Sequence, residues 1–127
     1  ISSHTHIYRD TTLFFITTDV GGQYTDAAVE EIFSQIELLR NEPIAQEELD
    51  LVRHVMEGDF IRSIDGIFER SERYRQMFTT GVNEQFRLNY FSALKNITPQ
   101  RLQALADKYL RREELAVTAV GTVENSL

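Results

Sequence analysis

The sequence contains no cysteine, and this absence excludes a disulfide and a thiol nucleophile but leaves every cellular compartment open. It also has no run of about 18 apolar residues, the length that a membrane-spanning helix needs. Gly21-Gly22 lacks the later glycine and the lysine of a phosphate-binding loop, and no Gly-x-Ser-x-Gly elbow occurs. The chemistry of thiol enzymes, P-loop enzymes and serine hydrolases is therefore not expected.

Positive charge is also scarce, because 13 Lys and Arg stand against 20 Asp and Glu, giving a formal net charge of -7. Nucleic-acid binding needs a basic face, so we expect no nucleic-acid partner. What the chain does have is hydrophobic residues, 42% of 127, which is enough for one globular domain with a modest core.

Two β-strands are predicted near the start, over residues 1–8 and 11–20. The second, TTLFFITTDV, is rich in β-branched and aromatic residues and has apolar side chains on both faces. Only Arg9-Asp10 separates the two strands, so a hairpin is expected. A third, short buried strand is predicted over residues 115–121, LAVTAVG.

Four or five helices are predicted between these strands. The best marked runs from Gln46 to Arg62 after Pro43 and has an acidic first turn. The others are predicted over residues 25–40 with Thr25 as N-cap, over residues 67–78, after the N-cap Asn83, and from Thr98-Pro99. Their predicted apolar stripes comprise Val29, Ile32, Phe33, Ile36, Leu39, Leu49, Val52, Met56, Phe60, Ile67, Ser71, Tyr74, Met77, Phe78, Phe86, Tyr90, Leu94, Leu102, Leu105, Ala106, Tyr109 and Leu110.

This order predicts an α+β fold, in which strands from both chain ends join one antiparallel or mixed sheet with several helices packed on one face. Residues 1–127 are expected to form a single, partial domain. The chain begins at Ile1 inside a strand-like stretch, so we expect a piece of a longer protein whose first strands and linker are missing. A raw sheet edge then favours a homodimer of the fragment.

Metal chemistry is suggested at two places. His54 and Glu57 are spaced as in the His-x-x-Glu-His motif of inverted zinc peptidases, but the fifth position is Gly58, and one imidazole does not hold a zinc that needs three protein ligands. His4 and His6 lie two residues apart, hence on one strand face, without an evident third ligand. Both places favour ordinary polar surface, and we predict no metal site.

The stretch ERSERYR, residues 69–75, interleaves basic and acidic residues. It is able to bind an acidic group, but a solvated helix face with local ion pairs is the simpler interpretation.

The order of these pieces resembles the pitrilysin/insulinase family of zinc peptidases, which includes the mitochondrial processing peptidases. The resemblance covers residues 11–122 and rests on TLFFITTDV, Glu-Pro-Ile at residues 42–44, Glu47-Glu48-Leu49 with Arg53 and Gly58 following, residues 96–99 (NITP) and LAVTAVG. In that family, homologous α+β domains pair into a clamshell around unfolded peptides. One half carries the zinc motif and the other half supplies chamber wall.

The resemblance implies a non-catalytic, C-terminal-half domain of a zinc metalloendopeptidase that forms chamber wall and contributes to peptide binding. It implies no catalytic residue and no cofactor in this chain, zinc in a catalytic half or partner subunit, and unfolded peptide as substrate. The family's substrate-contacting residues would precede Ile1, so the substrate-binding residues stay unknown. The compartment is also left open, with a soluble protein of the bacterial periplasm or cytoplasm as the expectation.

Three alternatives remain. The chain itself is an enzyme whose metal is held by His4, His6 and His54; it is a structural subunit derived from the same peptidase family; or it is an acidic helical interaction module outside that family. A sheet of three strands would argue against the last.

Overall fold

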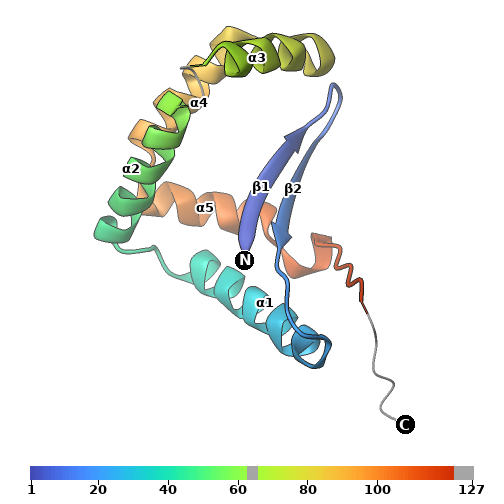
Figure 1. The fold of residues 1–127 in the computed structure, drawn as a ribbon. Helices are drawn as coiled ribbons and strands as arrows, with labels where there is room; N and C mark the ends of the chain where they lie inside the picture. The colour runs from blue at the N-terminus through green and yellow to red at the C-terminus, as the bar shows by residue number, and fades with distance from the viewer. Residues whose placement is uncertain (63–65, 122–127) are drawn as a thin grey trace. The chain divides into compact units, whose positions relative to one another are not determined.

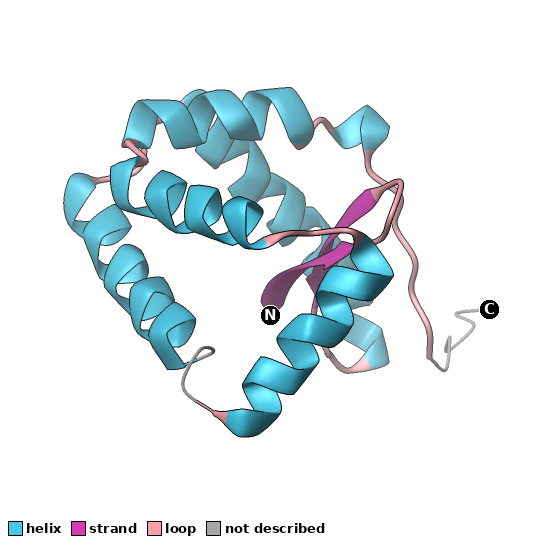
Figure 2. Ribbon diagram, turned by 90° about the horizontal axis from the view of Figure 1, so that it is seen from above, coloured by secondary structure: helices cyan, strands magenta, loops and turns pink. Residues whose placement is uncertain are grey.

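A computed structural model describes residues 1–62 and 66–121 of the protein. This part of the chain contains β1 (Ser2–Ile7), β2 (Thr12–Thr17), α1 (Thr25–Asn41), α2 (Gln46–Arg62), α3 (Ile67–Thr80), α4 (Glu84–Asn96) and α5 (Pro99–Tyr109), with short 3-10 helices at Gly22–Tyr24 and Arg112–Glu114 (Figures 1 and 2). The antiparallel hairpin followed by helices confirms the predicted α+β class. No helix in the described ranges has the length and apolar character needed to cross a membrane.

The chain divides into two compact units. The first contains residues 1–17 and 46–97, and therefore β1, β2, α2, α3 and α4. The second contains residues 18–45 and the chain from Thr98 onward, and therefore α1 and α5. The assignment of both units to a single domain stays a prediction.

The hairpin of the first unit is a two-stranded antiparallel sheet, in a register that pairs Ser2 with Thr17. Arg9 and Asp10 occupy the loop between the strands, as predicted. The amide of Tyr8 closes this loop by donating a hydrogen bond of 2.8 Å to the Thr11 carbonyl.

The predicted third strand over residues 115–121 is wrong. In the structure, residues 115–120 form no regular element, and Val117 and Val120 are 55% and 96% exposed. Apolar and β-branched residues give a stretch strand propensity, but a strand also needs a neighbouring ladder of hydrogen bonds, which propensity does not supply. In the described part of the chain the sheet consists of β1 and β2 alone.

Helix α2 has the predicted bounds, and two predicted N-caps are confirmed. The Asn83 side chain accepts a hydrogen bond of 2.9 Å from the Phe86 amide at the start of α4. The Thr98 hydroxyl accepts one of 3.2 Å from the Arg101 amide, and Pro99 takes the first helical position of α5. Each cap satisfies an amide that has no partner within its own helix.

Two other helix ends are not closed by a side-chain cap. The prediction of Thr25 as an N-cap is wrong: Thr25 is the first residue of α1, the cap position is Tyr24, and the Thr25 hydroxyl donates to the Gly22 carbonyl at 2.9 Å. Gly81 ends α3 with a φ of 74°, in the left-handed region that glycine adopts without a steric cost, and its amide donates to the Met77 carbonyl.

Within the first unit, α2 contacts α4, and an arginine of α2 bonds to the end of α4. The same helix carries one buried leucine. Leu49 is only 5% exposed. The Arg53 guanidinium donates to the Leu94 carbonyl at 3.2 Å and to the Ile97 carbonyl at 2.7 Å, and it also pairs with Asp50 on its own helix. Arg53 thereby satisfies carbonyls at the end of α4 that have no partner within that helix.

The core of the second unit lies between α1 and α5. Phe33 and Ile36 of α1 are 6% and 7% exposed, and Ala106 of α5 is 4% exposed. At the edge of this contact, Arg40 of α1 donates to the Asp107 carboxylate of α5 at 3.0 Å.

The predicted apolar stripes are only partly covered. Those buried or half-buried are Val29, Ile32, Phe33, Ile36, Leu39, Leu49, Phe60, Met77, Leu94, Leu102, Leu105, Ala106 and Leu110. Those exposed, against prediction, are Val52, Met56, Ile67, Ser71, Tyr74, Phe78, Phe86, Tyr90 and Tyr109. Helical periodicity predicts which face of a helix is apolar, whereas tertiary contacts decide whether another element covers that face.

Candidate functional site

The β1–β2 hairpin exposes both of its faces. Only Ile7 and Ile16 are half-buried, while Leu13, Phe14 and Phe15 are 45%, 50% and 37% exposed. Neither strand contains Lys, Arg, Asp or Glu, and in the part of the chain that the structure describes each strand pairs along one edge only. A sheet edge without charges or prolines presents unpaired amide and carbonyl groups to an extended peptide.

One face of the hairpin carries an aromatic cluster of His4, His6 and Phe15. The two imidazoles lie with their ring centroids 5.2 Å apart and their planes at 75°. Phe15, opposite His4 in the register, stacks on His4 at 5.3 Å and meets His6 edge-on at 5.5 Å. The sequence predicts that the histidines share a face, but the strand register was needed to add Phe15.

His54, the third histidine, lies on α2 and is exposed. Its Nδ1 lies 2.6 Å from the Asp50 carbonyl oxygen, and because a carbonyl only accepts, Nδ1 carries the proton and donates. Across residues 1–62 and 66–121 there is no group of three or more His, Cys, Asp or Glu arranged to hold a metal ion. The structure therefore does not assemble the three ligands His4, His6 and His54 that the enzyme alternative requires.

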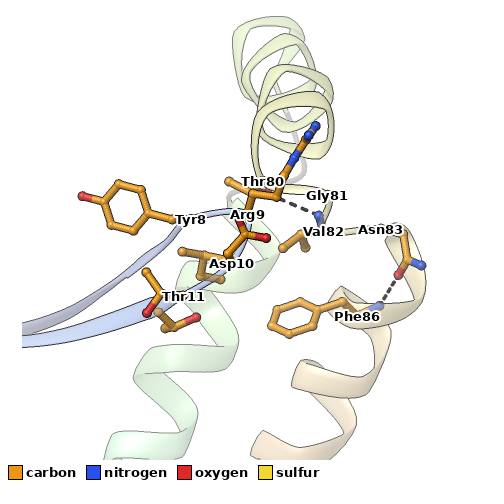
Figure 3. Close-up of a pocket in the computed structure, with 11 residues that line it drawn as sticks. Tyr8, Arg9, Asp10, Thr11, Thr80, Gly81, Val82, Asn83 and Phe86 are labelled. Atoms are coloured by element: carbon orange, nitrogen blue, oxygen red, sulfur yellow. Dashed lines mark hydrogen bonds between the residues drawn. The ribbon is translucent and has the colours of Figure 1, made fainter.

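A surface pocket of about 470 Å³ lies between the hairpin loop and the connection from α3 to α4 (Figure 3). It is lined by Ile7, Tyr8, Arg9, Asp10, Thr11, Thr12, Thr80, Gly81, Val82, Asn83 and Phe86. Its walls are ordered by the Asn83 cap and by a hydrogen bond of 3.3 Å from the Val82 amide to the Thr80 hydroxyl. The lining offers hydroxyls and one carboxylate but no histidine, so it holds no nucleophile activated by an imidazole base.

The charge cluster on α3 contains the ion pair that its sequence predicts. Arg75 donates to Glu72 at 2.7 Å, both side chains are exposed, and this hydrogen bond lowers the pKa of Glu72. The side chains of Glu69, Arg70 and Arg73 lie outside the described residues. Glu72 and Arg75 thus fit the interpretation as a solvated face.

A second ion pair joins distant parts of the second unit. Arg112 donates to both carboxylate oxygens of Glu30, at 2.6 and 3.2 Å, and its guanidinium lies 4.2 Å from the ring centroid of Phe33. The hydrogen bond and then the charge of Arg112 lower the pKa of Glu30. Arg112 therefore lies over the core and is held there by Glu30.

We expect Arg112→Gln to lower the melting temperature at pH 7 and this difference to become smaller in acid, where only the contact of Arg112 with the Phe33 ring remains. Because the folded pKa of Glu30 is depressed, its stabilisation is present above the ordinary value of 4.5 and is lost as the pH falls through the folded pKa. The measurement is thermal unfolding of both proteins from pH 7 downward. Arg111→Gln is the matched control, because Arg111 donates to a backbone carbonyl, that of Asp107, instead of a carboxylate. A gap between wild type and Arg112→Gln that stays constant with pH would contradict the role of Glu30.

Comparison with known proteins finds a family match for the part of the chain that contains the hairpin. Residues 1–56 match the sequence family described as the Peptidase M16 inactive domain. This range contains β1, β2, α1 and the first part of α2, with the Glu47-Glu48-Leu49 stretch that the resemblance used. Searches of curated proteins and of solved structures give no match. Residues 1–56 are therefore similar to the Peptidase M16 inactive domain, which confirms the predicted resemblance to a non-catalytic, pitrilysin-like domain.

Proposed function

We propose that this chain is the non-catalytic domain of a zinc-dependent metalloendopeptidase, where it forms chamber wall and contributes to the binding of extended peptide. The observation that carries the proposal is the match of residues 1–56 to an inactive peptidase domain, a range that includes the exposed hairpin.

The physical argument for peptide binding starts from the outer edges of β1 and β2. A peptide that adds a strand to such an edge gains main-chain hydrogen bonds whatever its sequence, which suits a chamber that receives unfolded chains. The exposed apolar side chains Leu13 and Phe15 share one face of β2, and Phe14 lies on the other, so alternate side chains of the peptide have apolar surface on both faces.

The proposal assigns the zinc to a catalytic half or partner subunit. The spacing from His54 to Glu57 matches part of the family motif, but Gly58 stands where the second histidine would be. A catalytic zinc site needs three protein ligands and an open position. The chain alone is then expected to bind peptide without cleaving it, and a homodimer through the same strand edges competes with peptide.

We expect an unstructured, fluorescently labelled peptide to bind the chain, and Thr5→Lys in β1 to weaken that binding by roughly tenfold. A lysine at a strand edge is a device that natural sheets use to prevent pairing. The measurement is fluorescence anisotropy, with the same peptide N-methylated at alternate residues as a probe that lacks half of its amide donors. Thr79→Lys, on the exposed surface of α3, is the matched control for the added charge. Equal binding of the plain and methylated peptides would contradict pairing at the edge.

A structural subunit derived from the same family is the second candidate function. It is favoured by the exposed aromatic and aliphatic residues of α3, where Ile67, Phe68 and Phe78 are 86%, 87% and 83% exposed. Apolar surface of this kind typically contacts a protein partner. Absence of any peptide binding, in a chain whose folding is verified by circular dichroism, would favour this candidate over the first.

A further inference from the structure

We propose that His4 and His6 form a two-imidazole binding site for a divalent transition metal ion on the exposed face of the hairpin. Both side chains are exposed, project from the same face of β1, and lie with their ring centroids 5.2 Å apart. Imidazole is a ligand that Zn²⁺, Ni²⁺ and Cu²⁺ all accept. This site uses side chains on one face of the hairpin, whereas the peptide pairing proposed above uses backbone groups at the strand edges, and it has no catalytic role.

The spacing of the two rings fits one metal ion between them. An imidazole nitrogen binds Zn²⁺ at about 2.0–2.1 Å, and the ring centroid lies about 1.1 Å further from the metal, so each centroid is about 3.2 Å away. Two such ligands at the tetrahedral angle have their centroids about 5.2 Å apart. The observed separation of 5.2 Å matches this geometry, and the two rings, which now lie edge to face at 75°, have to turn their nitrogens toward one point.

Phe15, which lies on the adjacent strand β2, restricts the imidazole rings of His4 and His6. It contacts both imidazoles, stacked on His4 and edge-on to His6. Because the register places Phe15 opposite His4, both imidazoles are held beside the same ring. These contacts keep the two histidine side chains next to one another on one face, so less conformational entropy is lost in bringing them together at a metal, although the rings still turn.

The remaining coordination positions are assigned to water. Among the described residues, no third His, Cys, Asp or Glu joins the pair. A catalytic zinc needs three protein ligands, and for this reason the sequence predicts no metal site. A two-imidazole site is a weaker and more open one, and the net charge of -7 favours the approach of a cation.

The test is titration of the chain with Zn²⁺ by calorimetry. We expect one ion per chain and, in His4→Gln and in His6→Gln, an affinity reduced roughly tenfold or more, because the second ligand then no longer acts at the high effective concentration of a tethered group. His54→Gln is the matched control: it removes the third histidine and leaves the pair intact, so its affinity is expected to equal that of wild type. Circular dichroism of each variant confirms that the fold is retained.

A second readout repeats the titration with Ni²⁺, which also accepts imidazole ligands. Binding is expected in wild type and in His54→Gln, and is expected to be weakened in His4→Gln. The inference is overturned if His4→Gln and His6→Gln bind Zn²⁺ as wild type does, if His54→Gln abolishes binding, or if wild type binds no Zn²⁺. Failure of peptide binding at the strand edge leaves this result unaffected, since the two tests use different variants and probes.

Discussion

Replacing Phe33 by alanine is expected to lower the free energy of unfolding by about 3–4 kcal/mol, the largest effect of any substitution considered for this chain. Phe33 is 6% exposed in the contact between α1 and α5, and the guanidinium of Arg112 lies over its ring. Its removal loses buried apolar area, leaves a cavity that the neighbouring helices fill only in part, and removes the cation–π contact. Since small domains are stable by only about 5–15 kcal/mol, a loss of this size removes a large share of the total.

The measurement is urea unfolding followed by circular dichroism, with Phe78→Ala as the matched control. Phe78 on α3 is 83% exposed, so the same change of side chain there is expected to alter the unfolding free energy by less than about 0.5 kcal/mol. Similar losses in both variants would mean that Phe33 is not part of a packed core.

The second large effect is expected for Arg53→Met, with a loss of about 2 kcal/mol. The methionine keeps part of the apolar stem but has no donor for the Leu94 and Ile97 carbonyls, which Arg53 contacts at 3.2 and 2.7 Å. The Arg53 side chain is 18% exposed, so water replaces these hydrogen bonds only in part, and the unpaired carbonyls add to the cost. We expect α2 and α4 to lose their contact first, which amide hydrogen exchange of α4 would report as reduced protection.

Arg62→Met is the matched control on the same helix. Arg62 also pairs with an aspartate three residues before it, Asp59, but its side chain is 73% exposed. An exposed ion pair of this kind contributes at most about 0.5 kcal/mol, so this variant is expected to unfold close to wild type. An Arg53→Met variant as stable as Arg62→Met would show that the Asp50 pair, and not the two carbonyls, accounts for what Arg53 contributes.

The helices were the most predictable part of the fold, because their signals are local. Pro99 after Thr98 and Asn83 before α4 act through their own neighbours, within three residues of the cap. The start of α2 follows from Pro43 and from its acidic first turn for the same reason.

The signal for the hairpin is also local, since Arg9 and Asp10 fill the short loop between two strand-like stretches. The side-chain contacts on the hairpin are less predictable. The sequence places His4 and His6 on one face, yet the contact with Phe15 depends on strand register. The sequence singles out Arg53 only through the family resemblance, because its two carbonyl partners lie 41 and 44 residues away.

By itself the sequence determined the α+β class, the helices, the hairpin and the resemblance to a non-catalytic peptidase domain, since propensities, caps and motif order are all carried by residues close together in the chain. The tertiary structure alone decided which apolar stripes are covered, that residues 115–120 pair with no strand, and that His4, His6 and Phe15 form one cluster. These depend on contacts between segments far apart in the chain, for which a local pattern of residues specifies the side chain offered but not its partner.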